Sequence, residues 1–189
     1  MSRDAWRWLP NLITLGRLLL AWPLYQALEA GRFALAAGLA AIAAASDALD
    51  GWLAKRMGWV TRLGGMLDPI ADKALVMSAF LGLHGAGLVP LWLLVIVVGR
   101  DLVIVAGAAA YRLLIGPFEP EPTVPGKITT FAQLGLLLWI LCDAALLELP
   151  GAGTAVLTWL TAALTALSGV HYVWLWSGRA RRALRERPA

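Results

Sequence analysis

The sequence predicts an all-α, polytopic membrane protein, because composition, apolar run length and charge placement all favour this fold class. Of the 189 residues, 60% are hydrophobic and 15% are charged, with a mean hydropathy of +0.72. An ordinary soluble domain has roughly 25% charged residues, so most of this chain is expected to lie within a bilayer. The length suits a single domain over residues 1–189.

Six apolar runs have the length of about 20 residues that a helix needs to cross the hydrocarbon core. Glycines, prolines or charged residues separate them, which is usual between helices. One separator, Gly116–Gly126, contains four prolines and is expected to be an extended connector. The six expected spans are Leu12–Leu28, Phe33–Leu53, Pro69–Leu88, Leu91–Leu114, Thr130–Leu149 and Thr154–Trp176.

The lysines and arginines outside these runs predict the orientation, because short positively charged loops stay on the cytoplasmic side of a membrane. With both termini in the cytoplasm, Arg32 is the loop cation left on the opposite side, and the number of spans must be even. We therefore expect six transmembrane helices and two cytoplasmic termini. The cations then expected in the cytoplasm are Arg3, Arg7, Lys55, Arg56, Arg62, Arg112, Lys127, Arg179, Arg181, Arg182, Arg185 and Arg187.

Two pairs of aspartates stand where the second expected span ends and the third begins. Asp47 and Asp50 are three residues apart, and Asp68 and Asp72 are four apart. Both spacings place a pair on one face of a helix. The connection is short, so the two helices are expected to be antiparallel neighbours whose four carboxylates meet at the cytoplasmic membrane edge. Ionisable groups inside spans are costly and usually functional.

Four converging carboxylates need protons or cations to neutralise them. Oxygen ligands suit hard divalent ions such as Mg²⁺, Mn²⁺ or Ca²⁺, and two such ions side by side suit a displacement at phosphorus. One carboxylate left partly free could take the proton of an attacking hydroxyl. Salt-bridged helix ends are the simpler explanation, but they do not account for four carboxylates beside Gly51 and Gly64.

The whole stretch resembles the signature of the CDP-alcohol phosphatidyltransferase family. From Asp47 to Asp72 it reads D-x2-D-G-x2-A-K-x8-G-x3-D-x3-D, which departs from that signature at Lys55, where the family has arginine. Lysine keeps the charge but lacks the planar fork of arginine. Near the N-terminus, PNLITLGRL is similar to the opening motif of the family.

The resemblance implies transfer of a phosphatidyl group from CDP-diacylglycerol to an alcohol, with release of CMP. It also implies two divalent cations, Mg²⁺ or Mn²⁺, as cofactors, and a homodimer surrounded by membrane lipids. The absence of a transit peptide favours a bacterial-type plasma membrane, the loop charges predict a site on the cytoplasmic side, and no nucleic-acid partner is expected. The implied metal ligands are Asp47, Asp50, Asp68 and Asp72, of which Asp72 is also the general base. The residues implied for the nucleotide pocket are Asn11, Thr14, Arg17, Gly51, Ala54, Lys55 and Gly64.

The identity of the alcohol depends on the second half of the chain. Arg100 in the fourth expected span either holds an acceptor phosphate or pairs with Asp101 and neighbouring helices to lock the bundle. Arg112 and Lys127 either complete an anion pocket or anchor helix ends. RDLVIVAGAAAYR followed by GKITTFAQ resembles the glycerol-acceptor branches of the family. We expect phosphatidylglycerol as acceptor, as in a cardiolipin synthase, with glycerol-3-phosphate, as in a phosphatidylglycerophosphate synthase, as the alternative.

A carboxylate-based ion transporter is the non-enzyme alternative. Transporters place such groups near the membrane midplane at broken helices, whereas these aspartates are expected at one membrane edge. An assembly subunit with Ala- and Gly-rich helix faces would leave the aspartates without a purpose. The sequence therefore favours an enzyme.

Overall fold

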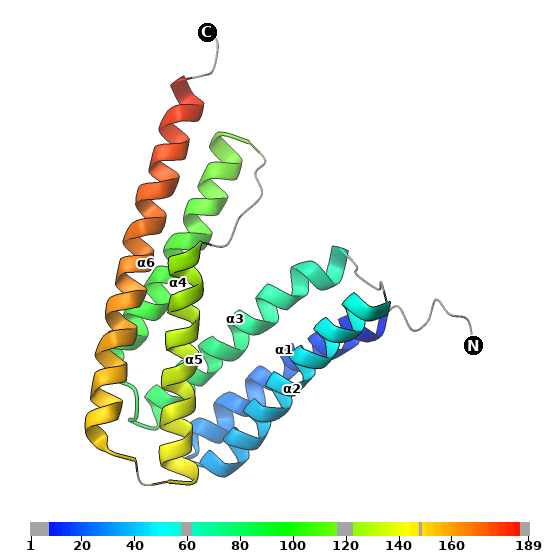
Figure 1. Ribbon diagram of the computed structural model, residues 1–189, viewed down its shortest axis with the longest axis vertical. Helices are drawn as coiled ribbons and strands as arrows, with labels where there is room; N and C mark the ends of the chain where they lie inside the picture. Colours follow the sequence, from blue (N-terminus) through cyan, green and yellow to red (C-terminus); the bar gives the residue numbers. More distant parts are fainter. Residues whose placement is uncertain (1–7, 58–61, 117–122, 148, 186–189) are drawn as a thin grey trace. The chain divides into compact units, whose positions relative to one another are not determined.

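The computed structural model describes residues 8–57, 62–116, 123–147 and 149–185. Within these ranges the chain forms six α-helices and no strand, which confirms the predicted all-α class (Figure 1). The helices are α1 (Leu9–Glu29), α2 (Phe33–Met57), α3 (Arg62–Gly85), α4 (Leu91–Leu114), α5 (Val124–Ala145) and α6 (Gly151–Arg185).

Several helix ends differ from those expected. The helix α3 begins at Arg62, so Pro69 lies inside it; a proline removes one backbone hydrogen bond but does not end this helix. The helix α5 begins at Val124, which places Pro125 in its first turn. The N–H groups of a first turn have no partner within the helix, so a proline there costs no helical hydrogen bond. The helix α6 continues nine residues past Trp176 to Arg185 and is 35 residues long, well beyond the roughly 20 residues of a span.

Four of the described helices are long and apolar enough to cross a membrane, so the chain is a membrane protein with several apolar helices. Neither α1 nor α3 is among these four, and both carry ionisable residues in their middle turns, Arg17 in α1 and Asp72 and Lys73 in α3. Six spans and cytoplasmic termini therefore stay predictions. The four qualifying segments are Phe33–Leu53, Leu91–Leu114, Val124–Ala145 and Gly151–Ala183.

The chain forms two compact units, and α5 contributes to both. The first unit contains α1, α2, α3 and the part of α5 from Trp139 onward. The second unit contains α4, the part of α5 up to Leu138, and α6. Each unit carries its own set of buried polar groups, so each is described by itself.

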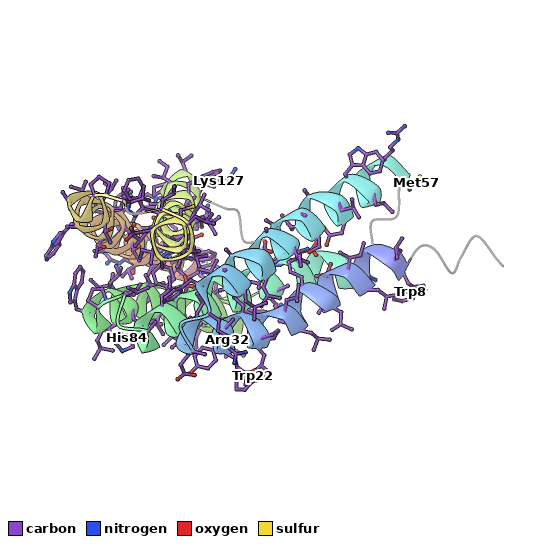
Figure 2. All side chains as sticks on the ribbon, turned by 90° about the horizontal axis from the view of Figure 1, so that it is seen from below. Trp8, Trp22, Arg32, Met57, His84 and Lys127 are labelled. Carbon is purple, nitrogen blue, oxygen red and sulfur yellow. The ribbon has the colours of Figure 1, made fainter. Side chains whose placement is uncertain are left out.

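In the first unit, α1 packs against both α2 and α3. Trp8 and Met57 are labelled at one end of the α1–α2 pair and Arg32 at the other in Figure 2, as two antiparallel helices joined by a tight turn require. The α1–α3 contact is close at Gly82, where an added Cβ would lie 2.6 Å from the Leu28 Cβ and 3.0 Å from the Tyr25 carbonyl oxygen. A small residue is thus needed where these two helices meet.

In the second unit, α4 and α6 are in contact, and Trp92 and Trp159 stack with ring centroids 4.7 Å apart. In the described part of the chain, three side-chain hydrogen bonds link α5 to α6. Thr129 Oγ1 donates to the Leu164 carbonyl oxygen at 3.0 Å, and Gln133 Nε2 donates to Thr165 Oγ1 at 3.3 Å. The third runs from Thr161 Oγ1 to the Ala132 carbonyl oxygen. These buried polar side chains bind neighbouring helices in a setting with little water to compete.

Gly82→Ala is expected to destabilise the protein by about 1–3 kcal/mol, because the new methyl group overpacks a rigid contact with α1. Gly38→Ala is the matched control, since its Cβ would meet nothing within 4 Å and alanine favours the helix. Thermal unfolding in detergent, followed by circular dichroism, measures both variants. Equal melting temperatures for the two would contradict the close α1–α3 contact.

Candidate active site

The four motif aspartates converge on one guanidinium group. Arg17 of α1 donates from Nη1 to Asp47 Oδ1 of α2 and, at 2.6 Å, to Asp72 Oδ1 of α3. Its Nη2 donates to Asp50 Oδ2 at 2.5 Å and lies 3.7 Å from Asp68 Oδ1. The expected meeting of both aspartate pairs is therefore present in the structure, with an arginine at its centre.

The hydroxyl group of Thr14 lies one turn before Arg17 on the same face of α1. Its Oγ1 lies 2.8 Å from Asp68 Oδ1 and 3.2 Å from Asp50 Oδ2, so it can donate to either carboxylate. Asn11, another three residues earlier, is also buried. The opening motif PNLITLGRL thus places Asn11, Thr14 and Arg17 on one stripe of α1, and the last two residues contact the aspartates.

Burial differs sharply within this cluster. The side chains of Arg17 and Asp50 are 1% and 5% exposed, whereas those of Asp47, Asp68 and Asp72 are 57%, 47% and 57% exposed. Four carboxylates and one guanidinium have a formal charge of −4 + 1 = −3. The cluster is therefore closed on the Arg17 side and offers anionic oxygens on its open side.

Such an oxygen set fits the chemistry of a hard divalent cation. In the described part of the chain, however, no three acidic, histidine or cysteine side chains are arranged so that they could hold a metal ion. The reason is geometric, because the carboxylates point at the Arg17 guanidinium, which fills the space between them. The donor chemistry suits metal binding, and in the present arrangement the guanidinium of Arg17 is the cation that the carboxylates contact.

The family resemblance implied a place for Arg17 in the nucleotide pocket, and the contact between Arg17 and the aspartates was not predicted. A signal for that contact was present: an arginine in an apolar helix needs a buried anionic partner, and the aspartates are the nearest candidates by topology. The spacing of residues along one helix cannot show which neighbouring helix its arginine faces.

The other residues expected at the nucleotide pocket lie beside the aspartates along the chain. Gly51 follows Asp50 in α2, and an added Cβ at Gly51 would meet nothing within 4 Å. Open space therefore adjoins a buried carboxylate. Ala54 and Lys55 lie in α2 and Gly64 in α3, but the side chains of Ala54 and Lys55 and the surroundings of Gly64 are outside what the structure describes.

The expected acceptor residues lie in the second unit. The side chain of Arg100 in α4 is 8% exposed; its Nη1 donates to Asp101 Oδ1 at 2.8 Å, and its Nη2 donates to Ser168 Oγ of α6 at 3.1 Å. These bonds are those expected if Arg100 locks helices together. Arg112 in the last turn of α4 and Lys127 in the first turn of α5 are both exposed.

Comparison with known proteins identifies relatives of the whole region. A family model for CDP-alcohol phosphatidyltransferase matches residues 7–167. The chain is 33% identical to a probable cardiolipin synthase (CMP-forming) of Drosophila melanogaster, over 86% of this chain and 56% of the relative. It is 34% identical to a probable phosphatidylglycerophosphate synthase of Mycobacterium tuberculosis (strain ATCC 25618 / H37Rv), over 87% of this chain and 79% of the relative.

A further relative, the CDP-diacylglycerol–glycerol-3-phosphate 3-phosphatidyltransferase of Bacillus subtilis (strain 168), is 32% identical over 87% of this chain and 92% of its own. The chain spans just over half the length of some relatives, among them the Drosophila melanogaster protein, of which it covers 56%. The matched region includes α1 to α5 and the first half of α6, and hence all four motif aspartates.

Arg17→Gln is expected to destabilise the metal-free protein by about 3–5 kcal/mol, because it leaves buried and clustered carboxylates without their cation. Melting temperatures in excess chelator measure the effect, and Mn²⁺ added to a chelator-free sample should restore part of the loss. Arg56→Gln is the control, since Arg56 is exposed and stacks on Trp52 of its own helix. A loss no larger in Arg17→Gln than in Arg56→Gln would show that the cluster does not need this guanidinium.

Proposed function

Because the chain belongs to the CDP-alcohol phosphatidyltransferase family, we propose that it transfers a phosphatidyl group from CDP-diacylglycerol to an alcohol and releases CMP. The observation that carries this proposal is the convergence of the motif aspartates of α2 and α3 on the α1 stripe. A diphosphate needs countercharge and its attacking hydroxyl needs a base, and an anionic cluster open on one side can serve both needs.

In the proposed reaction, the acceptor oxygen forms a bond to the phosphatidyl phosphorus. The bond between that phosphorus and the bridging diphosphate oxygen breaks, and CMP leaves with the bridging oxygen. Asp72 takes the hydroxyl proton, a task that suits a half-exposed carboxylate better than the buried Asp50. The residues proposed to shape the nucleotide pocket are Asn11, Thr14, Arg17, Gly51, Ala54, Lys55 and Gly64.

We propose that Asp47, Asp50, Asp68 and Asp72 hold two divalent cations, Mg²⁺ or Mn²⁺. When bound, these ions would neutralise the diphosphate and stabilise the attacking and leaving oxygens. Within the protein, Thr14 orients Asp50 and Asp68 through its hydroxyl group. Arg17 pairs with Asp47 and Asp72, which keeps these two half-exposed carboxylates next to each other.

The acceptor proposed is phosphatidylglycerol, with glycerol-3-phosphate as the second candidate. Relatives with names of both kinds match the chain at similar identity, 33% for a probable cardiolipin synthase and 34% for a probable phosphatidylglycerophosphate synthase. Arg100, Arg112 and Lys127 are the cations proposed to meet the acceptor phosphate. The protein is proposed to be a homodimer in a bacterial-type plasma membrane, with its aspartates on the cytoplasmic side.

The reaction is tested with the purified full-length chain and CDP-diacylglycerol, by measuring CMP release with each of four acceptors: phosphatidylglycerol, glycerol-3-phosphate, inositol phosphate and serine. Release is expected with Mg²⁺ or Mn²⁺ and phosphatidylglycerol together, and excess chelator should abolish it. Undiminished release in chelator would contradict the cation proposal. Failure of all four alcohols would contradict the acceptor assignment.

Asp72→Asn is expected to lower the turnover number by about 100-fold or more, because the amide cannot take the hydroxyl proton. Binding of CDP-diacylglycerol, measured separately, should weaken less than turnover. Asp143→Asn is the matched control, because Asp143 accepts from the Leu149 N–H group at 2.8 Å and the amide oxygen can still accept. Equal losses of binding and turnover in Asp72→Asn would exclude a specific role as base.

A further inference from the structure

Arg17 lies among the oxygens that a divalent cation would need. Its Nη1 donates to Asp47 and, at 2.6 Å, to Asp72. Its Nη2 donates to Asp50 at 2.5 Å. Within the described part of the chain, no three acidic, histidine or cysteine side chains are arranged to hold a metal ion. The carboxylate oxygens that could converge on a metal therefore face a guanidinium instead.

The charge of the cluster suits either Arg17 or two divalent cations, but not both in full contact. The four carboxylates carry a formal charge of −4, which two divalent cations neutralise by themselves. Arg17 would then be a positive charge without a matching anion, although its side chain is 1% exposed. A buried ion is stable only beside an opposite charge. A cation bound to Asp72 would also repel the guanidinium, which lies 2.6 Å from the same carboxylate.

A cation from solvent can reach the aspartates without passing Arg17. The side chains of Asp47, Asp68 and Asp72 are about half exposed, whereas that of Arg17 is buried. Beside the buried Asp50, an added Cβ at Gly51 would meet nothing within 4 Å. An entering cation therefore meets the exposed carboxylates first, and it must draw their oxygens away from the guanidinium in order to bind.

The present position of Arg17 leaves one of its own donors unsatisfied. Its Nε is buried and has no hydrogen-bond partner. A buried donor without an acceptor costs free energy, so part of what the ion pairs contribute is lost at Nε. The carboxylates therefore hold Arg17 with an incomplete set of hydrogen bonds, which makes the guanidinium easier to replace by a cation that matches them better.

We propose that Arg17 competes with the divalent cations: it pairs with the aspartates in the metal-free protein and leaves them when the cations bind. This rests on the cation role proposed above for the aspartates. Without metal, Arg17 offsets the mutual repulsion of the carboxylates of α2 and α3. Because its ion pairs must break before the cations bind, Arg17 lowers the affinity of the cluster for metal and so sets the concentration at which the site fills.

Mn²⁺ binding to the purified, metal-free full-length chain tests this competition, with free Mn²⁺ measured by electron paramagnetic resonance. Arg17→Gln should bind Mn²⁺ at least about tenfold more tightly than the wild type, because no ion pair has to break first. Arg56→Gln is the matched control, since it removes the same charge from an exposed position, where screening by salt should limit the gain to about twofold.

A gain in Arg17→Gln no larger than in Arg56→Gln would overturn the proposal, and weaker binding would show instead that Arg17 orients the metal ligands. Adding Asp72→Asn to Arg17→Gln should remove the gain, and a gain that persists would place the tighter binding outside the cluster and overturn the proposal. Absence of Mn²⁺ binding in the wild type and in Arg17→Gln would overturn the cation role of the aspartates as well, which separates the two failures.

Two further measurements decide the matter if Arg17→Gln does not fold. Arg17→Lys keeps the charge but lacks the fork of donors that reaches several carboxylates, so it should bind Mn²⁺ about threefold more tightly than the wild type. In the wild type labelled with ¹⁵N-arginine, hydrogen exchange of the buried Arg17 Nε–H, identified by its absence from Arg17→Lys, should be slow without metal and faster at saturating Mg²⁺. Unchanged protection at saturating Mg²⁺ would show that Arg17 stays in place and would overturn the proposal.

Discussion

The buried guanidinium of Arg17 holds the first unit together at its most polar point. One side chain of α1 contacts both aspartates of α2 and both aspartates of α3. Removing an arginine from water costs several kcal/mol, and only close ion pairs offset that penalty. Close packing of these three helices therefore requires the ion pairs of Arg17, and those ion pairs form only when the three helices pack together. The close α1–α3 approach at Gly82 lies on the same pair of helices.

The two units pair their buried arginines differently. Arg17 is outnumbered by four carboxylates, so its surroundings remain anionic and suit cations. Arg100 has one carboxylate partner, Asp101, and a hydroxyl partner, so its charge is balanced within the second unit. All the aspartates of the family motif lie in α2 and α3, so the motif accounts for the anionic cluster and not for the surroundings of Arg100.

Acceptor choice must therefore depend on residues outside the shared motif. Relatives named for cardiolipin synthesis and for phosphatidylglycerophosphate synthesis match this chain at 33% and 34% identity, so overall identity does not separate them. A lipid acceptor and a soluble acceptor differ chiefly in the apolar surface that they bring.

The sequence by itself determined the all-α class, the bounds of α4, and the sharing of a helix face within each aspartate pair. These features depend on composition and on spacing along a single helix, which a sequence shows directly. Tertiary structure alone decided that Arg17 lies among the carboxylates and that Arg100 of α4 donates to Ser168 of α6. It also decided that α3 and α5 begin earlier than their apolar runs and that α6 extends into its basic tail. Partners on different helices depend on which faces pack together, and no spacing within one helix specifies that choice.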